Sequence, residues 1–413
     1  MLKIWRAISL VILMAVSFSV SAQEEESVII VKEEEKKPWY EVLSLGGYVQ
    51  VRYNRLFESN GQLKCDQCDK SIGENGGIFI RRARIKISGD ISPRVFLYLQ
   101  TDVASNAMSN GSTPGLHYLQ LRDLYGDIFL DKGKAFKLRV GLSKVPYGFD
   151  NLQSSQNRIA FDRTDAINSA AINERDQGAF LYWTPAVARQ RFKDIMKSGL
   201  KGTGDYGLLG FGVANGQTAN RTELNDDLNV YFRVTYPFLL TNGQYIEAGA
   251  NAYSGVINVS EFNRTGIHYS RSSYADRRVG GYVVVYPQPF GIQAEYNFGE
   301  GPEFDYDAHT GVKAIKSQNL HGGYVQLMYK MNYKQGIIFP YARVQYYEGG
   351  KKLETDARSY IVKELEAGVE WEIIPSLEVT TAYVLSDRTF EDSARPENNQ
   401  KGGFLRLQVQ FNY

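Results

Sequence analysis

The sequence predicts an all-β protein, a closed antiparallel transmembrane β-barrel of about 16 strands, with 18 as the alternative count. Segments of alternating apolar and polar residues recur from residue 45, each near the ~9–11 residues that a tilted strand needs to cross a bilayer. Short and long connections alternate, as expected when one end of a barrel carries turns and the other carries external loops. The segment "LRLQVQFNY", residues 405–413, alternates strictly, as expected for a strand that closes a barrel.

The N-terminal region precedes the predicted barrel. Residues 1–22 predict a cleaved secretory signal peptide, because two basic residues precede an apolar run and a small-residue exit. Residues 23–44 are rich in charge and predict a periplasmic tether. Residues 45–413 form the predicted barrel domain, located in the bacterial outer membrane and surrounded by its lipid.

The strands follow from period-2 alternation, and no long helical pattern occurs after residue 45. The predicted strands cover residues 45–57, 77–90, 93–104, 117–131, 134–145, 176–184, 205–215, 226–236, 243–253, 278–286, 290–298, 318–330, 336–347, 361–372, 376–386 and 402–413. The longest connection, 146–175, is the third external loop. The connection 185–204 is expected to be short and is not, so either a hairpin lies within it or the count changes by two.

Alternation assigns apolar side chains to the lipid face and polar side chains to the lumen face. In "IFIRRARIKIS", residues 78–88, we expect Phe79 and Ala83 on the lipid face. Arg81 also falls on that face, so we expect it near a rim, where its guanidinium can snorkel to water.

Charged residues of the lumen face form two sets. The predicted anion pathway consists of Arg52, Arg82, Arg84, Lys86, Lys137, Arg139 and Arg233. The opposing lumen acids are Glu364, Glu366 and Glu370. A row of cations along one wall would pass anions down a pore. The alternative is that these charges pair with one another and only line the wall.

Several motifs together resemble a known family. The segment "LSKVPYGFDNLQSSQNRIAFDRTDAINSAAINERDQGAFLYW", residues 142–183, together with "FIRRARIKISGDI", "LRDLYGDIFL" and "NVYFRVTYPF", resembles the phosphate-selective porins of the O/P type. The resemblance implies a sixteen-stranded homotrimeric outer-membrane porin whose third external loop folds into the lumen. It also implies an anion pathway with a ladder of arginines and a lysine cluster, and Arg81, Arg82 and Arg84 match its "RRAR" motif.

Charges in the third external loop are candidates for the constriction. They are Arg158, Asp162, Arg163 and Asp165. Either they line the narrowest part of the pore, where a carboxylate would disfavour bulky anions, or they form a salt-bridged network that holds the loop against the wall.

"CDQC" lies in the first external loop, where an oxidising compartment favours a local disulfide between Cys65 and Cys68. No catalytic, cofactor-binding or metal-ligating set is found, and the sequence predicts no enzyme. The formal net charge of +1 gives no support for a nucleic-acid partner.

The sequence therefore predicts a porin for passive diffusion of small, preferentially anionic solutes such as phosphate. A non-selective general porin is one alternative, and a surface nutrient-binding or adhesin barrel is another. The aromatic end of the last strand resembles the signal by which the barrel assembly machinery recognises outer-membrane barrels.

Overall fold

In a computed structural model, the described part of the chain forms one strand-built unit over Trp39–Tyr413. The described residues are 39–65, 77–103, 119–172, 174–219, 221, 223–259, 267–269 and 273–413. The predicted signal peptide and most of the predicted tether lie outside them. A short 3₁₀ helix, η1 (Trp39–Val42), leads into the first strand.

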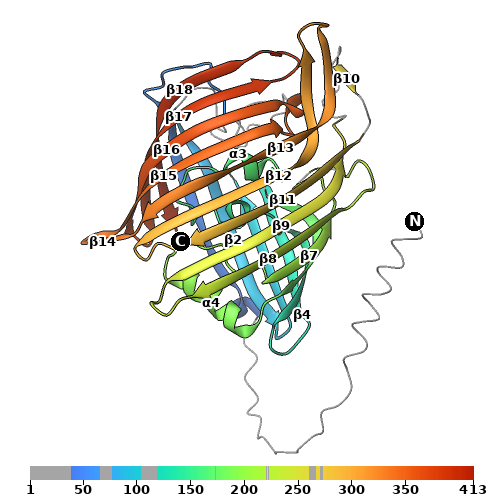
Figure 1. Cartoon of the computed structure of the whole chain (residues 1–413). Helices are drawn as coiled ribbons and strands as arrows, with labels where there is room; N and C mark the ends of the chain where they lie inside the picture. Colours follow the sequence, from blue (N-terminus) through green and yellow to red (C-terminus); the bar gives the residue numbers. More distant parts are fainter. Residues whose placement is uncertain are drawn as a thin grey trace, which may run out of the picture. The chain divides into compact units, whose positions relative to one another are not determined.

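The sheet closes on itself as a barrel (Figure 1). Its barrel strands are β1 (Ser44–Leu56), β2 (Ile78–Ser92), β3 (Val95–Asp102), β4 (Gln120–Phe129), β5 (Phe136–Lys144), β6 (Arg175–Trp183), β7 (Leu209–Ala214), β8 (Asn229–Leu239), β9 (Tyr245–Ile257), β11 (Tyr274–Val285), β12 (Phe290–Asp307), β13 (Val312–Tyr329), β15 (Gly336–Gly350), β16 (Ser359–Ile374), β17 (Leu377–Glu391) and β18 (Asn399–Asn412). Each pairs antiparallel with its neighbours, and β18 pairs with β1 in the register Gln50↔Gln410. The predicted count of sixteen is confirmed.

Two short strands complete the sheet. β14 (Met331–Tyr333) continues β13 along β15. β10 (Ile267–Tyr269) is an extra strand that pairs parallel with β13. With every barrel strand paired on both sides, the backbone leaves no open edge to the surroundings, which is the requirement for crossing hydrocarbon with strands.

Alternation along each strand separates an apolar outer face from a polar inner face. In β8, Phe232 is 47% exposed, whereas its neighbour Arg233 is 1% exposed. The outer faces of other strands likewise carry exposed Leu, Val, Ile and aromatic side chains. An exposed surface of this composition is stable in lipid and unfavourable in water.

The predicted faces of β2 are wrong at its start, because β2 contains a β-bulge. Gln50 of β1 pairs with Arg82, but the next residue, Val51, pairs with Ile80, which leaves Arg81 as the extra residue. The bulge shifts the alternation by one position, as an inserted residue must. Phe79 and Arg81 are therefore buried on the inner face, and Arg81 does not snorkel at a rim.

The connection between β6 and β7 holds a helix, not a hairpin. α4 (Ala186–Lys197) starts after Pro185 and ends before Gly199. The expectation that no long helix follows residue 45 is wrong, although Pro before the helix and Gly after it are ordinary helix boundary signals. Among the described residues, no helix is long and apolar enough to cross a membrane.

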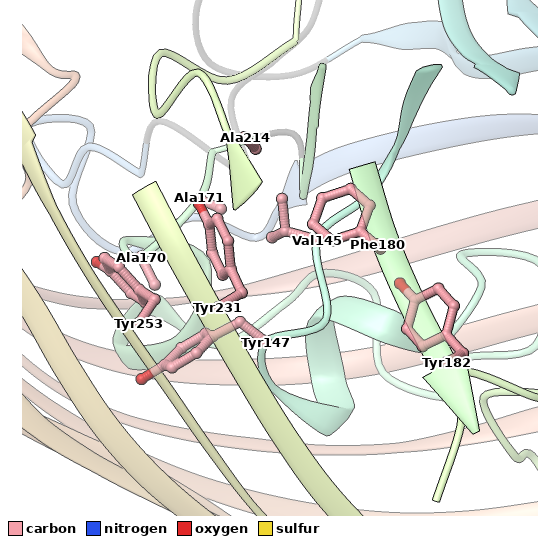
Figure 2. Close-up of a cluster of buried hydrophobic side chains, with 9 residues drawn as sticks. All are labelled: Val145, Tyr147, Ala170, Ala171, Phe180, Tyr182, Ala214, Tyr231 and Tyr253. Carbon is pink, nitrogen blue, oxygen red and sulfur yellow. The ribbon is translucent and has the colours of Figure 1, made fainter. Parts of the chain in front are cut away.

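The loop between β5 and β6, residues 145–174, contains two one-turn helices, α2 (Phe149–Leu152) and α3 (Asp165–Asn168). An apolar cluster holds both ends of this β5–β6 loop (Figure 2). Its members are Val145, Tyr147, Ala170 and Ala171 of the loop and Phe180, Tyr182, Ala214, Tyr231 and Tyr253 of strands β6 to β9. Tyr147 and Tyr253 meet edge-to-face with ring centroids 5.0 Å apart. A second short 3₁₀ helix, η3 (Thr355–Ala357), precedes β16.

Candidate functional site

The β5–β6 loop contacts the inner faces of strands on several sides of the ring. Gln50 of β1 donates to the carbonyl oxygen of Ser155 at 3.0 Å. Glu295 of β12 accepts from the backbone N–H of Phe149 at 2.8 Å. These contacts join the loop to strands far from β5 and β6, and its side chains are buried along most of its length.

Asp162 is the most heavily paired carboxylate of the loop. Its oxygens lie 3.0 Å from Arg52, 3.3 Å from Arg81 and 3.9 Å from Arg82, and Arg406 of β18 also pairs with it. Burial alone would raise the pKa of Asp162, but the surrounding guanidinium groups hold it well below its usual range. The loop is therefore clamped to β1, β2 and β18 by one ionised carboxylate.

Asp165 forms a second clamp on the neighbouring part of the wall, since β17 pairs with β18. It lies 2.9 Å from Arg388 of β17 and 2.6 Å from Lys351, which follows β15. Burial favours the neutral acid, yet these two cations lower the pKa of Asp165 below its ordinary value. Arg388 also binds Glu364 of β16 at 2.9 Å, so the clamp extends along two neighbouring strands.

Glu174 closes the loop at its exit into β6. Arg163 lies 2.6 Å away and Arg175 lies 2.8 Å away. Despite burial, these cations lower the pKa of Glu174, while burial lowers the pKa of Arg163 to about 9. Arg158 instead donates to the loop carbonyl oxygens of Ala160 and Phe161. The four predicted constriction residues thus all take part in the network that holds the loop.

A polar cavity of about 170 Å³ lies between the loop, the wall and the chain that follows α4. It is lined by Arg84, Tyr98, Gln100, Asp123, Tyr125, Lys144, Leu152, Ser154, Ser155, Arg175, Thr203 and Tyr206. A single water needs only about 10–15 Å³ by the same measure, so the cavity can hold a small hydrated anion.

Among the residues that line this cavity, three are basic and one is acidic, although Glu174, outside the lining, also pairs with Arg175. Arg84 pairs with Asp102 at 2.9 Å, and Arg175 pairs with Asp123 at 2.9 Å. Lys144 differs, because its Nζ donates to the carbonyl oxygens of Leu152 and Gln153 at 2.7 and 3.0 Å, which neutralises no charge. Lys144 thus adds a cation to the lining that no carboxylate in its hydrogen-bond shell balances.

The sequence prediction singled out Arg84 and considered Arg175 among the charges of the long loop, but it missed Lys144 and Asp123. Lys144 and Arg175 lie within the quoted motifs "KVPYG" and "NERDQG", which was the available signal. Tyr98 and Tyr125, whose rings stack at a centroid distance of 5.1 Å, gave no signal beyond alternation.

The other residues of the predicted anion pathway also face the interior, but most are paired. Arg139 binds Asp127 at 2.7 Å, and Arg233 lies 3.2 Å from Glu247. Two lysines bind neutral groups closely. Lys86 donates to Gln156 Oε1 at 2.6 Å, and Lys137 donates to the carbonyl oxygen of Asp205 at 3.0 Å, with Asp127 at 3.8 Å.

The expected separation into a basic and an acidic wall is not observed. Glu366 binds Arg343 at 3.0 Å, and Glu370 binds Lys201 at 2.6 Å. The later strands thus carry their own buried arginines, including Arg388 and Arg406, which the sequence prediction did not single out. Each half of the barrel contains both signs.

Two smaller predictions concern cysteine and metals. Cys65 is disulfide-bonded, whereas Cys68 lies outside the described residues. Among the described residues, Glu370, Glu372 and Glu378 offer carboxylate oxygens within 4.8 Å of one another. The Lys201 ammonium group lies 2.6 and 2.5 Å from two of them, so a side-chain cation occupies the place that a metal ion would take.

A closed barrel with an apolar outer face and a charged inner face defines a membrane channel of the porin class. The family model described as phosphate-selective porin O and P matches residues 61–413, and the chain belongs to this family. The family and the fold place the chain in the bacterial outer membrane and indicate a channel, not an enzyme.

Three solved structures share this fold at low sequence identity. The outer-membrane channel DcaP of Acinetobacter baumannii matches with a TM-score of 0.54 and 11% identity over 90% of this chain and 97% of that one. OmpF of Salmonella typhi, in complex with daunomycin, matches with a TM-score of 0.56 and 12% identity over 90% of this chain and 97% of that one. OmpT of Vibrio cholerae, in its trimer form, matches with a TM-score of 0.53 and 10% identity over 90% of this chain and 100% of that one. No curated protein matches the sequence.

Proposed function

We propose that this protein is an outer-membrane porin for passive diffusion of small solutes with a preference for anions such as phosphate. The β5–β6 loop narrows the lumen by folding into it, and solutes pass between the loop and the wall. The contacts of the loop with β1, β12 and β17 support this arrangement. No chemical step is needed, since fixed charges replace part of the hydration of an ion and weak sites let it leave.

The excess positive charge at the polar cavity carries the proposed anion preference. Lys144 contributes a charge that no carboxylate in its hydrogen-bond shell cancels. A unit charge about 4 Å from a passing anion contributes on the order of 1–4 kcal/mol, depending on how much water screens it. The paired arginines elsewhere contribute less, because their carboxylates repel the same anion.

The extensive ion pairing favours a second candidate, a general porin without charge selectivity. Asp162, Asp165 and Glu366 each neutralise buried arginines that would otherwise form a ladder for anions. The two candidates differ in one measurable quantity, the permeability ratio of anion to cation.

Reversal potentials across a tenfold KCl gradient in planar bilayers test the proposal. We expect the wild-type channel to prefer anions, and Lys144→Gln to move the ratio several-fold toward cations, most at low salt. Glutamine keeps donors for the two carbonyl oxygens while it removes the charge. Lys132→Gln, in the exposed β4–β5 turn, is the matched control and should leave the ratio unchanged. A wild-type ratio near one would favour the general porin, and a cation preference would contradict the proposed selectivity.

Assembly as a homotrimer in the lipid of the outer membrane is part of the same proposal, as is insertion by the barrel assembly machinery through β18. The exposed apolar outer face supports contact with lipid or with further subunits. Cross-linking of the purified protein in detergent tests the oligomeric state, and a monomer alone would contradict the trimer.

A further inference from the structure

The connection between β6 and β7 is much longer than its counterparts at the same end of the barrel. Two residues separate β2 from β3, and two separate β16 from β17, whereas residues 184–208 join β6 to β7. α4 occupies the first half and packs Ala188 and Phe192 against Trp183 and Leu208. The second half, residues 198–207, is the α4–β7 segment.

The α4–β7 segment is anchored first to the wall formed by β13 to β16. Lys201 Nζ donates to Glu370 at 2.6 Å and to Glu372 at 2.5 Å, both on β16. Lys330, between β13 and β14, donates to the carbonyl oxygen of Ser198 at 2.7 Å. The segment therefore reaches strands far from the two that it connects.

Four residues later the same segment is anchored to the wall that it started from. Lys137 of β5 donates to the carbonyl oxygen of Asp205 at 3.0 Å, and Thr184 donates to its carboxylate at 2.7 Å. Around the closed ring, β5 and β16 are nearly opposite, seven strand steps apart by the shorter route. A chain held on inner faces of opposite walls crosses the opening between them.

The crossing lies directly against the β5–β6 loop. Gln153 of the loop donates to the carbonyl oxygen of Lys201 at 2.5 Å. Ile195 and Leu200 share one apolar cluster with Phe149 of the loop, with Tyr282 of β11 and with Tyr286, which directly follows β11. A solute that has passed the loop therefore meets a second obstacle at the end of the barrel with the short turns.

We propose that the α4–β7 segment forms a second constriction of the pore, and that Lys201 is the residue that holds it closed against β16. This inference rests on the proposed porin function and adds a barrier that acts on the size of the solute. It makes the two mouths of the channel unequal, because the loop and the segment lie in series.

The chemistry around Lys201 explains why this one residue has a large effect. Glu370, Glu372 and Glu378 place three carboxylates within 4.8 Å of one another, and they repel unless a cation lies among them. Lys201 is itself buried and supplies that cation. Without it, the carboxylates recruit water and mobile cations, and the segment loses its attachment to β16 while α4 keeps its apolar packing.

The test uses the full-length protein in planar bilayers, with polyethylene glycols of graded size added to one side at a time. We expect Lys201→Met to raise single-channel conductance by on the order of twofold, since the open cross-section grows. It should also raise the size of polymer that enters from the short-turn end, and leave the limit at the other end unchanged. Lys201→Arg should behave as wild type. Lys193→Met, on the exposed face of α4, is the matched control.

Each outcome decides one question. A conducting wild type with unchanged conductance and polymer limits in Lys201→Met would overturn this inference alone. A Lys201→Met channel that admits larger polymers from the short-turn end only would support it, and an equal rise from both ends would overturn it. A wild-type protein that inserts but conducts no ions would overturn the proposed porin function instead.

Discussion

The β5–β6 loop and the α4–β7 segment both contact walls on opposite sides of the barrel, but they are held by different forces. The loop carries three buried carboxylates, Asp162, Asp165 and Glu174, and each pairs with at least two cations. The segment relies on the few buried apolar residues of α4 and, at β16, on Lys201. The comparison indicates that the loop is fixed by many ion pairs, whereas a single cation, Lys201, makes the ion pairs that attach the segment to β16.

The largest change is expected from removing the loop. Replacing residues 150–170 by a short Gly-Ser linker should raise single-channel conductance several-fold and weaken charge selectivity, because the obstacle and its charged groups both leave the lumen. Conductance in planar bilayers measures the effect. Unchanged conductance would show that the loop does not narrow the pore, and the comparison with the α4–β7 segment would then fail.

Asp162→Asn sharpens the comparison by testing one clamp. It leaves Arg52, Arg81 and Arg406 buried without their shared carboxylate, and breaking a buried pair costs about 3–5 kcal/mol. We expect the folded barrel to lose its heat-resistant electrophoretic form at a lower temperature. Asp90→Asn, which removes an exposed partner of Lys134, is the control and should cost at most about 1 kcal/mol. Equal effects of both variants would contradict the clamp.

Acid should act on the loop at a defined pH. The pKa values of Asp162, Asp165 and Glu174 are lowered, because nearby cations outweigh burial. A lowered pKa gives stability that is present above the unfolded values of about 4 and is lost as pH falls through the folded values. Single-channel conductance should therefore stay constant from pH 7 to about 4, with fluctuations beginning only below that. Fluctuations that begin near pH 6 would contradict this expectation.

The smallest effect is expected from substituting the two glutamates that pair with Lys201. Glu370 has a side chain 3% exposed, whereas that of Glu372 is 22% exposed. Glu370→Gln should raise the polymer size limit from the short-turn end, and Glu372→Gln should change it little, because water screens the more exposed pair. A larger effect of Glu372→Gln would contradict this expectation and would show that Glu372, not Glu370, is the main partner of Lys201.

Much of the fold was predictable because alternation is a local signal. The existence of all sixteen strands follows from period 2, and so does the inner position of Arg233 and Glu366, although β12 and β13 extend well beyond the predicted 290–298 and 318–330. The bulge at Arg81 was not predictable, since it depends on register with β1. α4 was missed although its boundaries were visible, because its apolar residues Ala188, Phe192 and Ile195 are few.

The sequence predicted that the charged residues lie on the inner face of the barrel, but it did not predict which of them form ion pairs with one another. Asp162 and Arg406 are separated by most of the barrel sequence and meet only because β18 closes beside β1. Alternation gives the face of each charge but not its partner, so the sequence could not decide between an open row of cations and paired charges. Lys144 lies at the end of β5, and only the fold shows that its hydrogen-bond partners are carbonyl oxygens.

The seam between β1 and β18 has a consequence for how the barrel forms. Gln50 and Gln410 are joined by a side-chain hydrogen bond of 2.6 Å across 360 positions of sequence, and the whole seam has similar separations. Contacts between residues so distant in sequence form slowly, because the chain loses conformational entropy before these contacts contribute any stabilisation. Until β1 and β18 pair, the incomplete sheet has two unpaired edge strands that can pair with strands of other chains. Closure of the barrel therefore competes with aggregation during folding. A chaperone that covers either edge strand would reduce aggregation and so favour closure.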